Sequence, residues 1–220
     1  MTFPTTGVLD DFNRADQTEN LGSNWTVPLV NGQGSPGIIS NTLYDASPND
    51  SAYWNPITPG PDSEVYIDVS TKQTNNTSIN LELRVVDPGL TTRDGYDIRM
   101  RASATTDAFQ IRRIDNGTAT ALGADFSQEW SAGDSWGFEA IGSTLAAYYK
   151  TGGSWAQLGT RTDSTYSAAG RIGIITNDAT WRGDNFGGGT VVAEGGQPAM
   201  LRTQGVPTGA GRRDRPGGWN

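Results

Sequence analysis

Ile79-Asn-Leu-Glu-Leu-Arg-Val85 places an apolar residue at every odd position and a polar residue at every even position. Such a period of two is typical of a β-strand with one face on a core and the other face in water. Glu64-Val-Tyr-Ile-Asp-Val-Ser70 and Tyr96-Asp-Ile-Arg-Met-Arg-Ala102 repeat the pattern on either side of it. The three stretches are therefore predicted to be half-buried strands of antiparallel sheets.

Short stretches of the same kind, separated by turn residues, fill most of the remaining chain. Asp87-Pro-Gly, Asp94-Gly and Asn116-Gly are among the turn signals. Further strands are predicted at 8–12, 25–28, 37–40, 42–44, 51–55, 109–114, 135–141, 144–150, 155–159 and 170–176. No window of twelve residues keeps an apolar stripe with a period of 3.6, so no helix is expected. The sequence predicts an all-β protein in which two antiparallel sheets pack as a jelly-roll sandwich.

The composition excludes several kinds of active site and partner. The chain of 220 residues contains no His and no Cys. A Ser-His-Asp or Cys-His triad, a disulfide and an ordinary zinc site each need an imidazole or a sulfur, so none of them is available. The formal net charge of −8 disfavours nucleic acids and anionic membranes as partners, because both require a cationic surface. No stretch approaches the roughly 20 apolar residues of a membrane span.

The chain changes character near its end. Residues 190–220 are rich in Gly and Pro and carry a net charge of +2, which leaves −10 on residues 1–189. We expect residues 1–189 to form the sandwich and residues 190–220 to form an extended arm that docks on a neighbouring subunit, with a solvated tail as the alternative. Trp and Arg are frequent anchors of interfaces, and the arm contains Arg202, Arg212, Arg213, Arg215 and Trp219.

Four short motifs resemble those of concanavalin A-like, laminin G-like jelly-roll domains. Asp10-Asp-Phe-Asn-Arg-Ala-Asp16, followed by Leu21-Gly-Ser-Asn-Trp25, is similar to the opening strands of that family. Arg171-Ile-Gly-Ile174 and Asp184-Asn-Phe186 follow its closing order, and the resemblance covers roughly residues 8–188. Domains of this kind occur in glycan-binding proteins, in glycoside hydrolases and in structural proteins of tailed bacteriophages, so the fold alone does not settle the function.

The carboxylates argue against the hydrolase reading. Retaining glycosidases need two carboxyl groups about 5 to 5.5 Å apart. The hydrolases that this fold resembles carry them as Glu-x-Asp-x-x-Glu, whereas the six Glu of this chain are all ten or more residues apart. We therefore expect no enzyme. The outward Arg84, Arg99, Arg101 and Arg112 alternate with Glu82 and Asp97, which is typical of a solvated charge ladder.

The resemblance also implies one structural calcium ion. In the family this ion is often held where the first and last strands meet, and Asp10, Asp11 and Asp184 match those positions. Hard oxygen ligands suit Ca²⁺. The alternative is that these Asp side chains accept hydrogen bonds from turns.

The tryptophans divide into candidates for glycan binding and for the core. Trp54, Trp130, Trp155 and Trp181 lie next to turn residues, where a ring could stack on a sugar. Partly buried packing is the alternative for each of them. Trp25, Trp136 and Phe138 are predicted to be core residues.

We interpret the chain as a non-enzymatic structural protein of a bacteriophage virion, either a capsid decoration or a minor tail component. Its partners would be other virion proteins or copies of itself. Residues 1–9 lack the basic and apolar regions of a signal peptide, so synthesis in the host cytoplasm and residence in the virion are expected. The alternative is a carbohydrate-binding module that adheres to host-surface glycans, and a glycoside hydrolase is the weakest hypothesis.

Overall fold

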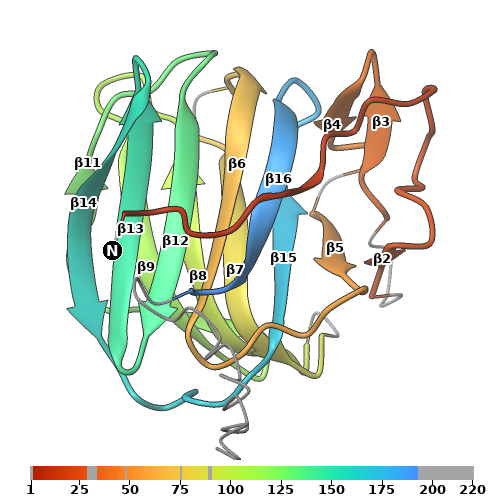
Figure 1. Ribbon diagram of the computed structural model, residues 1–220. Helices are drawn as coiled ribbons and strands as arrows, with labels where there is room; N and C mark the ends of the chain where they lie inside the picture. Colours follow the sequence, from red (N-terminus) through yellow and green to blue (C-terminus); the bar gives the residue numbers. More distant parts are fainter. Residues whose placement is uncertain (1, 29–33, 48, 75, 89–90, 193–220) are drawn as a thin grey trace, which may run out of the picture.

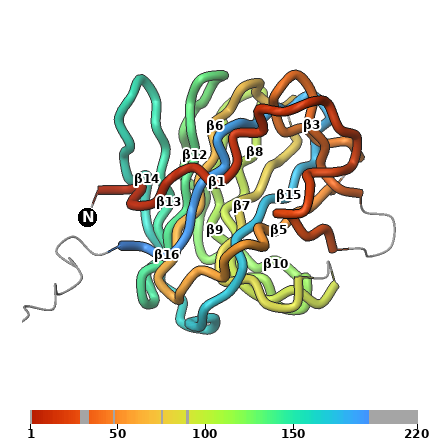
Figure 2. Tube along the Cα trace, turned by 45° about the vertical axis from the view of Figure 1, so that its right-hand side comes forward, coloured from red at the N-terminus to blue at the C-terminus, as the bar shows by residue number. Residues whose placement is uncertain are grey.

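The computed structural model describes residues 2–28, 34–47, 49–74, 76–88 and 91–192. Over these residues the chain forms sixteen strands and no helix, in agreement with the predicted all-β class (Figure 1). Within the same residues there is accordingly no helix that could cross a membrane. The strands form two antiparallel sheets that pack face to face as a sandwich (Figures 1 and 2).

The first sheet contains both the first and the last described strands. Its order is β14-β13-β12-β6-β16-β4-β3, and β1 also pairs with β16. The bounds are β1 (Val8–Asp10), β3 (Gly37–Ile39), β4 (Thr42–Tyr44), β6 (Ser63–Thr71), β12 (Ser135–Ile141), β13 (Thr144–Thr151), β14 (Ser154–Thr162) and β16 (Arg182–Thr190).

The second sheet has the order β10-β9-β8-β7-β15-β5-β2, and β11 also pairs with β9. Its strands are β2 (Trp25–Thr26), β5 (Asp50–Trp54), β7 (Ser78–Val86), β8 (Asp94–Arg101), β9 (Ala108–Asp115), β10 (Thr118–Ala121), β11 (Phe126–Ser127) and β15 (Arg171–Thr176). The short strands β10 and β11 were not predicted, whereas the strands with clear alternation lie within two or three residues of their predicted bounds.

The core lies between the two sheets and is built from the apolar positions of the alternating strands. Ile79, Leu81 and Leu83 of β7 are fully buried there. Trp25, Trp136 and Phe138 are exposed by only 6%, 0% and 0%, which confirms their prediction as core residues.

The N-terminal segment covers part of the outer face of the first sheet, where it crosses β13, β12 and β6 (Figure 1). The ring of Phe3 stacks on Tyr148, with 4.1 Å between the ring centroids, and meets the edge of Trp155 at 4.9 Å. The backbone N–H groups of Thr5 and Thr6 donate to Glu64 Oε1 at 2.7 and 2.6 Å. The two outer faces of the sandwich therefore differ, because this segment is packed across the first sheet.

The polar face of the second sheet is not solvated in the way that the alternation predicts. Glu82 and Asp97 are fully buried, and Asn80 is exposed by only 8%. The prediction of a solvated charge ladder is therefore wrong for this face. The cause is a cover of side chains from other segments, including Arg93 from the connection between β7 and β8.

Arg84 departs from the prediction for a second reason. It has a φ of 52° and lies where the β7–β8 register shifts between Leu83 and Val86, so the alternation is interrupted there. Its guanidinium is buried and donates to the carbonyl oxygens of Pro61, Tyr166 and Gly142 at 2.6, 3.0 and 2.9 Å. Arg84 thus ties three loops together and is not part of a solvated charge ladder.

The last described residues continue the sandwich slightly past the expected boundary at residue 189. β16 ends at Thr190, and the N–H groups of Val191 and Val192 donate to the Asp62 carbonyl and to Thr5 Oγ1. The predicted docking residues Arg202, Arg212, Arg213, Arg215 and Trp219 lie outside the described residues.

Candidate functional site

A hollow of about 350 Å³ lies on the outer face of the second sheet. Cross-strand register brings its residues together: Asn80 of β7 pairs with Arg99 of β8, and Asp97 pairs with Arg112 of β9. The complete lining is Asn49, Ser78, Asn80, Arg93, Arg99, Arg112, Ala119 and Ile175. We call it the arginine hollow.

Two buried carboxylates lie beneath the arginine hollow and hold its walls. Asp97 accepts from Arg112 through both oxygens, with 2.8 Å from Nε to Oδ1, and from the Asn80 amide at 3.3 Å. Glu82 lies 3.0 Å from Arg93 Nε and accepts from the Tyr53 hydroxyl. Burial raises the pKa of Glu82, and Arg93 opposes that increase. The two carboxylates position the arginines without lining the hollow themselves.

The same arrangement argues against a glycosidase-like pair. Glu82 and Asp97 are opposite each other on β7 and β8, but both are fully buried and each is held by an arginine. A carboxylate in that position cannot reach a glycosidic oxygen or an anomeric carbon. Their function in the fold is to neutralise and orient Arg93 and Arg112.

Several atoms of the arginine hollow have no hydrogen-bond partner among the described residues. They are the Asn80 Oδ1 acceptor and the Arg93 Nη1 and Arg99 Nε donors, together with Arg93 Nε, whose contact with Glu82 is an ion pair without hydrogen-bond geometry. Leaving a buried polar atom unpaired costs about 1 to 3 kcal/mol, so native proteins satisfy most of them. A polar ligand in the hollow would supply the missing partners. The sequence could not identify this site, because Arg93 comes from a loop and the unpaired atoms depend on tertiary contacts.

A second hollow, of about 570 Å³, lies beside β1 and includes Asp10, Arg14 and Leu21–Asn24 in its lining. Asp10 is saturated there: Oδ1 accepts from Phe12 N and Arg14 Nη1, and Oδ2 accepts from Arg14 Nη2 and the Trp25 indole at 2.7 Å. No buried side-chain atom of the described lining lacks a partner. Asp10 therefore joins Phe12, Arg14 and Trp25 in one hydrogen-bond network, which we call the Asp10 clasp. It has no free oxygen for the predicted calcium ion.

Asp11 and Asp184, in contrast, do lie at one polar hollow. It measures about 310 Å³ and is lined by Asp11, Asn13, Asn41, Asp184 and Asn185. Burial raises the pKa of Asp184, and the negative charges of Asp68, Asp11 and Asp10 add to the increase. Among the described residues no three acidic side chains converge as metal ligands. The oxygen atoms present fit a hard cation, but with two carboxylates in place of the predicted three.

The predicted tryptophan platforms are mostly core residues. Trp54, Trp130 and Trp181 are exposed by 5%, 4% and 0%, so the prediction of a stacking surface is wrong for these three. Trp181 stacks on Trp136 at 6.5 Å inside the sandwich. Trp155 is half-buried and meets the ring of Phe3 in an edge-type contact, so part of its surface is already covered.

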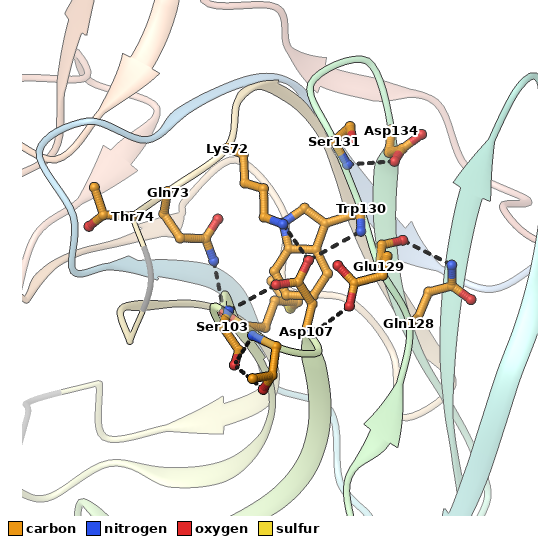
Figure 3. A network of polar contacts seen from close by, with 12 residues as sticks. Lys72, Gln73, Thr74, Ser103, Asp107, Gln128, Glu129, Trp130, Ser131 and Asp134 are labelled. Carbon is orange, nitrogen blue, oxygen red and sulfur yellow. Dashed lines mark hydrogen bonds and ion pairs between the residues drawn. The ribbon is translucent and has the colours of Figure 1, made fainter.

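Figure 3 shows how polar contacts secure Trp130 at the edge of the core. Asp107 is fully buried and accepts from Lys72 and from the backbone N–H groups of Ser103 and Trp130, at 2.9 and 3.3 Å for the two backbone bonds. The Lys72 ammonium also lies 5.3 Å from the centroid of the Trp130 ring. Lys72 and the core rings of Phe109 and Trp136 thus bury the Trp130 ring instead of leaving it exposed to solvent.

Comparison with known proteins shows the same jelly-roll sandwich fold in several solved structures. No known protein family profile and no curated protein sequence matches it. The solved carbohydrate-binding module CBM66 from Bacillus subtilis is similar, with a TM-score of 0.57, 19% identity and coverage of 78% of this chain and 96% of that one.

Two further structures have the same architecture. The CBM2 module of the evolved Dit of Lactobacillus casei BL23 phage J-1 has a TM-score of 0.57 and 11% identity, and covers 84% of this chain and 95% of that one. The Ca²⁺- and Man2-bound exoplasmic/lumenal domain of VIP36 has a TM-score of 0.59 and 11% identity, with coverage of 86% and 88%. At these identities the likeness establishes the jelly-roll fold, and the function has to be argued from the site.

Proposed function

We propose that the chain is a non-enzymatic carbohydrate-binding domain whose glycan site is the arginine hollow. The observation that carries the proposal is the set of unpartnered buried atoms of Asn80, Arg93 and Arg99 around one cavity. A cavity of about 350 Å³ is within the usual range for small ligands. The similarity to the carbohydrate-binding module CBM66 and to the Man2-bound domain of VIP36 supports this function over an enzymatic one.

The chemistry of the arginine hollow matches that of a saccharide. Arg93 and Arg99 would donate to hydroxyl or ring oxygens, and Asn80 Oδ1 would accept from a hydroxyl. Ile175 and Ala119 offer apolar surface to the C–H groups of a sugar ring. The buried Glu82 and Asp97 keep the arginines in place before the ligand arrives, which reduces the entropy lost on binding.

Filling the hollow tests the proposal. Ala119 lies on β10 with an exposed side chain that lines the cavity, so Ala119→Trp should place an indole in it without disturbing the core. In affinity gels and calorimetry against a polysaccharide panel, we expect this variant to bind at least tenfold more weakly than the original chain. Ala156→Trp, on exposed β14 of the first sheet, is the matched control and should bind normally. Equal binding by both variants, or no binding by the original chain across the panel, would overturn the proposal.

A second candidate function is suggested by the similarity to the module of a phage Dit. In this proposal the chain is a structural component of a bacteriophage virion, made in the host cytoplasm, and its sandwich is displayed on the particle. The arm with Arg202, Arg212, Arg213, Arg215 and Trp219 would dock on another virion protein or on a second copy. Deleting residues 193–220 should prevent incorporation into particles and leave the melting temperature unchanged. Particles that still carry the truncated chain would reject this function.

We also propose one calcium ion at the hollow of Asp11 and Asp184, completed by amide oxygens of Asn13, Asn41 or Asn185. A cation there would offset the burial and the repulsion from Asp68, Asp11 and Asp10 that raise the pKa of Asp184. Calcium at millimolar concentration should raise the melting temperature of the original chain by a few degrees and have no effect on Asp184→Asn. The same increase in both proteins would contradict this site.

A further inference from the structure

The arginine hollow carries an unusual charge for this molecule. Residues 1–189 have a net charge of −10, yet three arginines and no carboxylate line this cavity. Two of the three charges are already balanced, because Arg112 pairs with Asp97 and Arg93 pairs with Glu82 beneath the surface. Neither of these two carboxylates forms an ion pair with the third arginine, Arg99.

Arg99 lies near two other cations, Arg101 and Arg112. It makes no ion pair with any described residue, and its Nε has no hydrogen-bond acceptor there. Burial and repulsion from Arg112 and Arg101 lower its pKa, and attraction from Asp125 and Asp97, which pair with those two arginines, offsets only part of that decrease. A guanidinium that is half-buried without a counter-ion is costly unless another group supplies the negative charge.

We propose that the arginine hollow recognises an anionic group on the glycan, the carboxylate of a uronic acid or a phosphate ester, through Arg99. This inference rests on the proposed function and specifies its ligand class. Arg93 Nη1 would donate a second bond to the anion or to an adjacent oxygen, and Asn80 Oδ1 would accept from a neighbouring hydroxyl. Planar guanidinium groups bind carboxylates and phosphates in a bidentate manner, and such charge-assisted bonds are about twice as strong as neutral ones.

A matched pair of polymers separates charge from sugar identity. Polygalacturonate and its methyl ester share one backbone and differ in the carboxylate alone. We expect the full chain to bind the free acid at least tenfold more tightly than the ester in calorimetry, with a difference that shrinks as salt is added. Polyglycerol phosphate forms the second arm of the experiment and distinguishes a phosphate from a carboxylate as the preferred anion.

Two variants test whether Arg99 is responsible. Arg99→Gln should lose at least tenfold in affinity for the preferred anion and should remain folded, because the change removes a repelled charge. Arg171→Gln is the control for net charge: Arg171 is on β15 of the same sheet, about 13 Å along the strand from Ile175, and contacts Asn55. It should retain both the affinity and the preference for the anion.

The outcomes separate this inference from the proposed function. If neutral glycans bind and Ala119→Trp blocks them, while the acid, its ester and the phosphate polymer show no preference, the anionic inference fails and the carbohydrate-binding function stands. If Arg99→Gln and Arg171→Gln weaken binding equally, the attraction is general and the inference also fails. If no polymer binds, charged or neutral, both proposals fail.

Discussion

At the scale of single residues, adjacent carboxylates of the opening motif have different tasks. Asp10 joins Phe12 N, the Arg14 guanidinium and the Trp25 indole in one clasp, and Arg14 Nη2 also donates to the Leu21 carbonyl at 2.9 Å. Its neighbour Asp11 is exposed and, among the described residues, accepts only from Asn13 N. The motif that resembles the jelly-roll family is therefore explained by a local hydrogen-bond network.

Replacing each of the two carboxylates in turn measures this difference. Asp10→Asn removes the ion pair with Arg14 and should lower the free energy of unfolding by about 2 to 3 kcal/mol. Asp11→Asn should change it by less than about 0.5 kcal/mol in the absence of calcium. Urea unfolding followed by fluorescence gives both numbers. Equal losses would show that the clasp is not what makes Asp10 important.

Two other buried aspartates predict opposite dependences on pH. Burial raises the pKa of Asp45 to about 6, although Thr176 donates to it at 2.7 Å. Burial opposes ionisation of Asp178 as well, but bonds from Thr180, Thr74 and Thr77 outweigh it and lower its pKa. The folded state thus binds a proton more tightly than the unfolded chain at Asp45, and more weakly at Asp178.

This difference determines whether each substitution raises or lowers the free energy of unfolding. Asp45→Asn should raise the free energy of unfolding by about 2 kcal/mol at pH 7.5, and the gain should fade as the pH falls through 6 towards 4. Asp178→Asn should be destabilising at pH 7.5, and its loss should shrink once the pH falls below 4. Thermal unfolding across this pH range is the measurement. A destabilising effect of Asp45→Asn at pH 7.5 would contradict the burial argument.

At the scale of elements, the alternation in the sequence correctly located the long strands but not their surroundings. The period of two identifies which side chains of β7 share a face, and Ile79, Leu81 and Leu83 are in the core as it predicts. It cannot show that Arg93 and Tyr53 cover Glu82, or that a bulge redirects Arg84, because both depend on distant segments. The turn residues next to Trp130 and Trp181 in the sequence suggested exposed rings, whereas both rings are buried.

The three hydrogen bonds of the Arg84 guanidinium predict that this side chain stabilises the folded sandwich. Arg84→Lys keeps the charge but cannot reach the three carbonyl oxygens of Pro61, Gly142 and Tyr166 together. We expect the free energy of unfolding to fall by about 3 kcal/mol, because the buried side chain loses charge-assisted hydrogen bonds to three carbonyl groups. Arg171→Lys, which replaces a guanidinium with one side-chain contact, should cost less than about 0.5 kcal/mol. Similar losses in both would argue against a role for Arg84 as a tie between loops.

At the scale of the whole molecule, the two outer faces of the sandwich differ in what covers them. The first sheet carries the N-terminal segment across its outer face, with Phe3 packed on Tyr148 and Trp155. The second sheet presents a polar hollow with unpaired donors and acceptors. The sequence predicted the sandwich, but it placed candidate glycan binding on tryptophans that are mostly buried. We propose instead that the arginines on the outer face of the second sheet bind the glycan.

The most direct test of this account is a map of the amide chemical shifts of the full chain during titration with a polysaccharide fragment that it binds. The proposed function predicts that the shifts cluster on β7, β8 and β10 around Asn80, Arg99 and Ala119, which line the arginine hollow. Shifts confined to the hollow around Asp10 and Leu21–Asn24, or to the outer face of the first sheet, would contradict it.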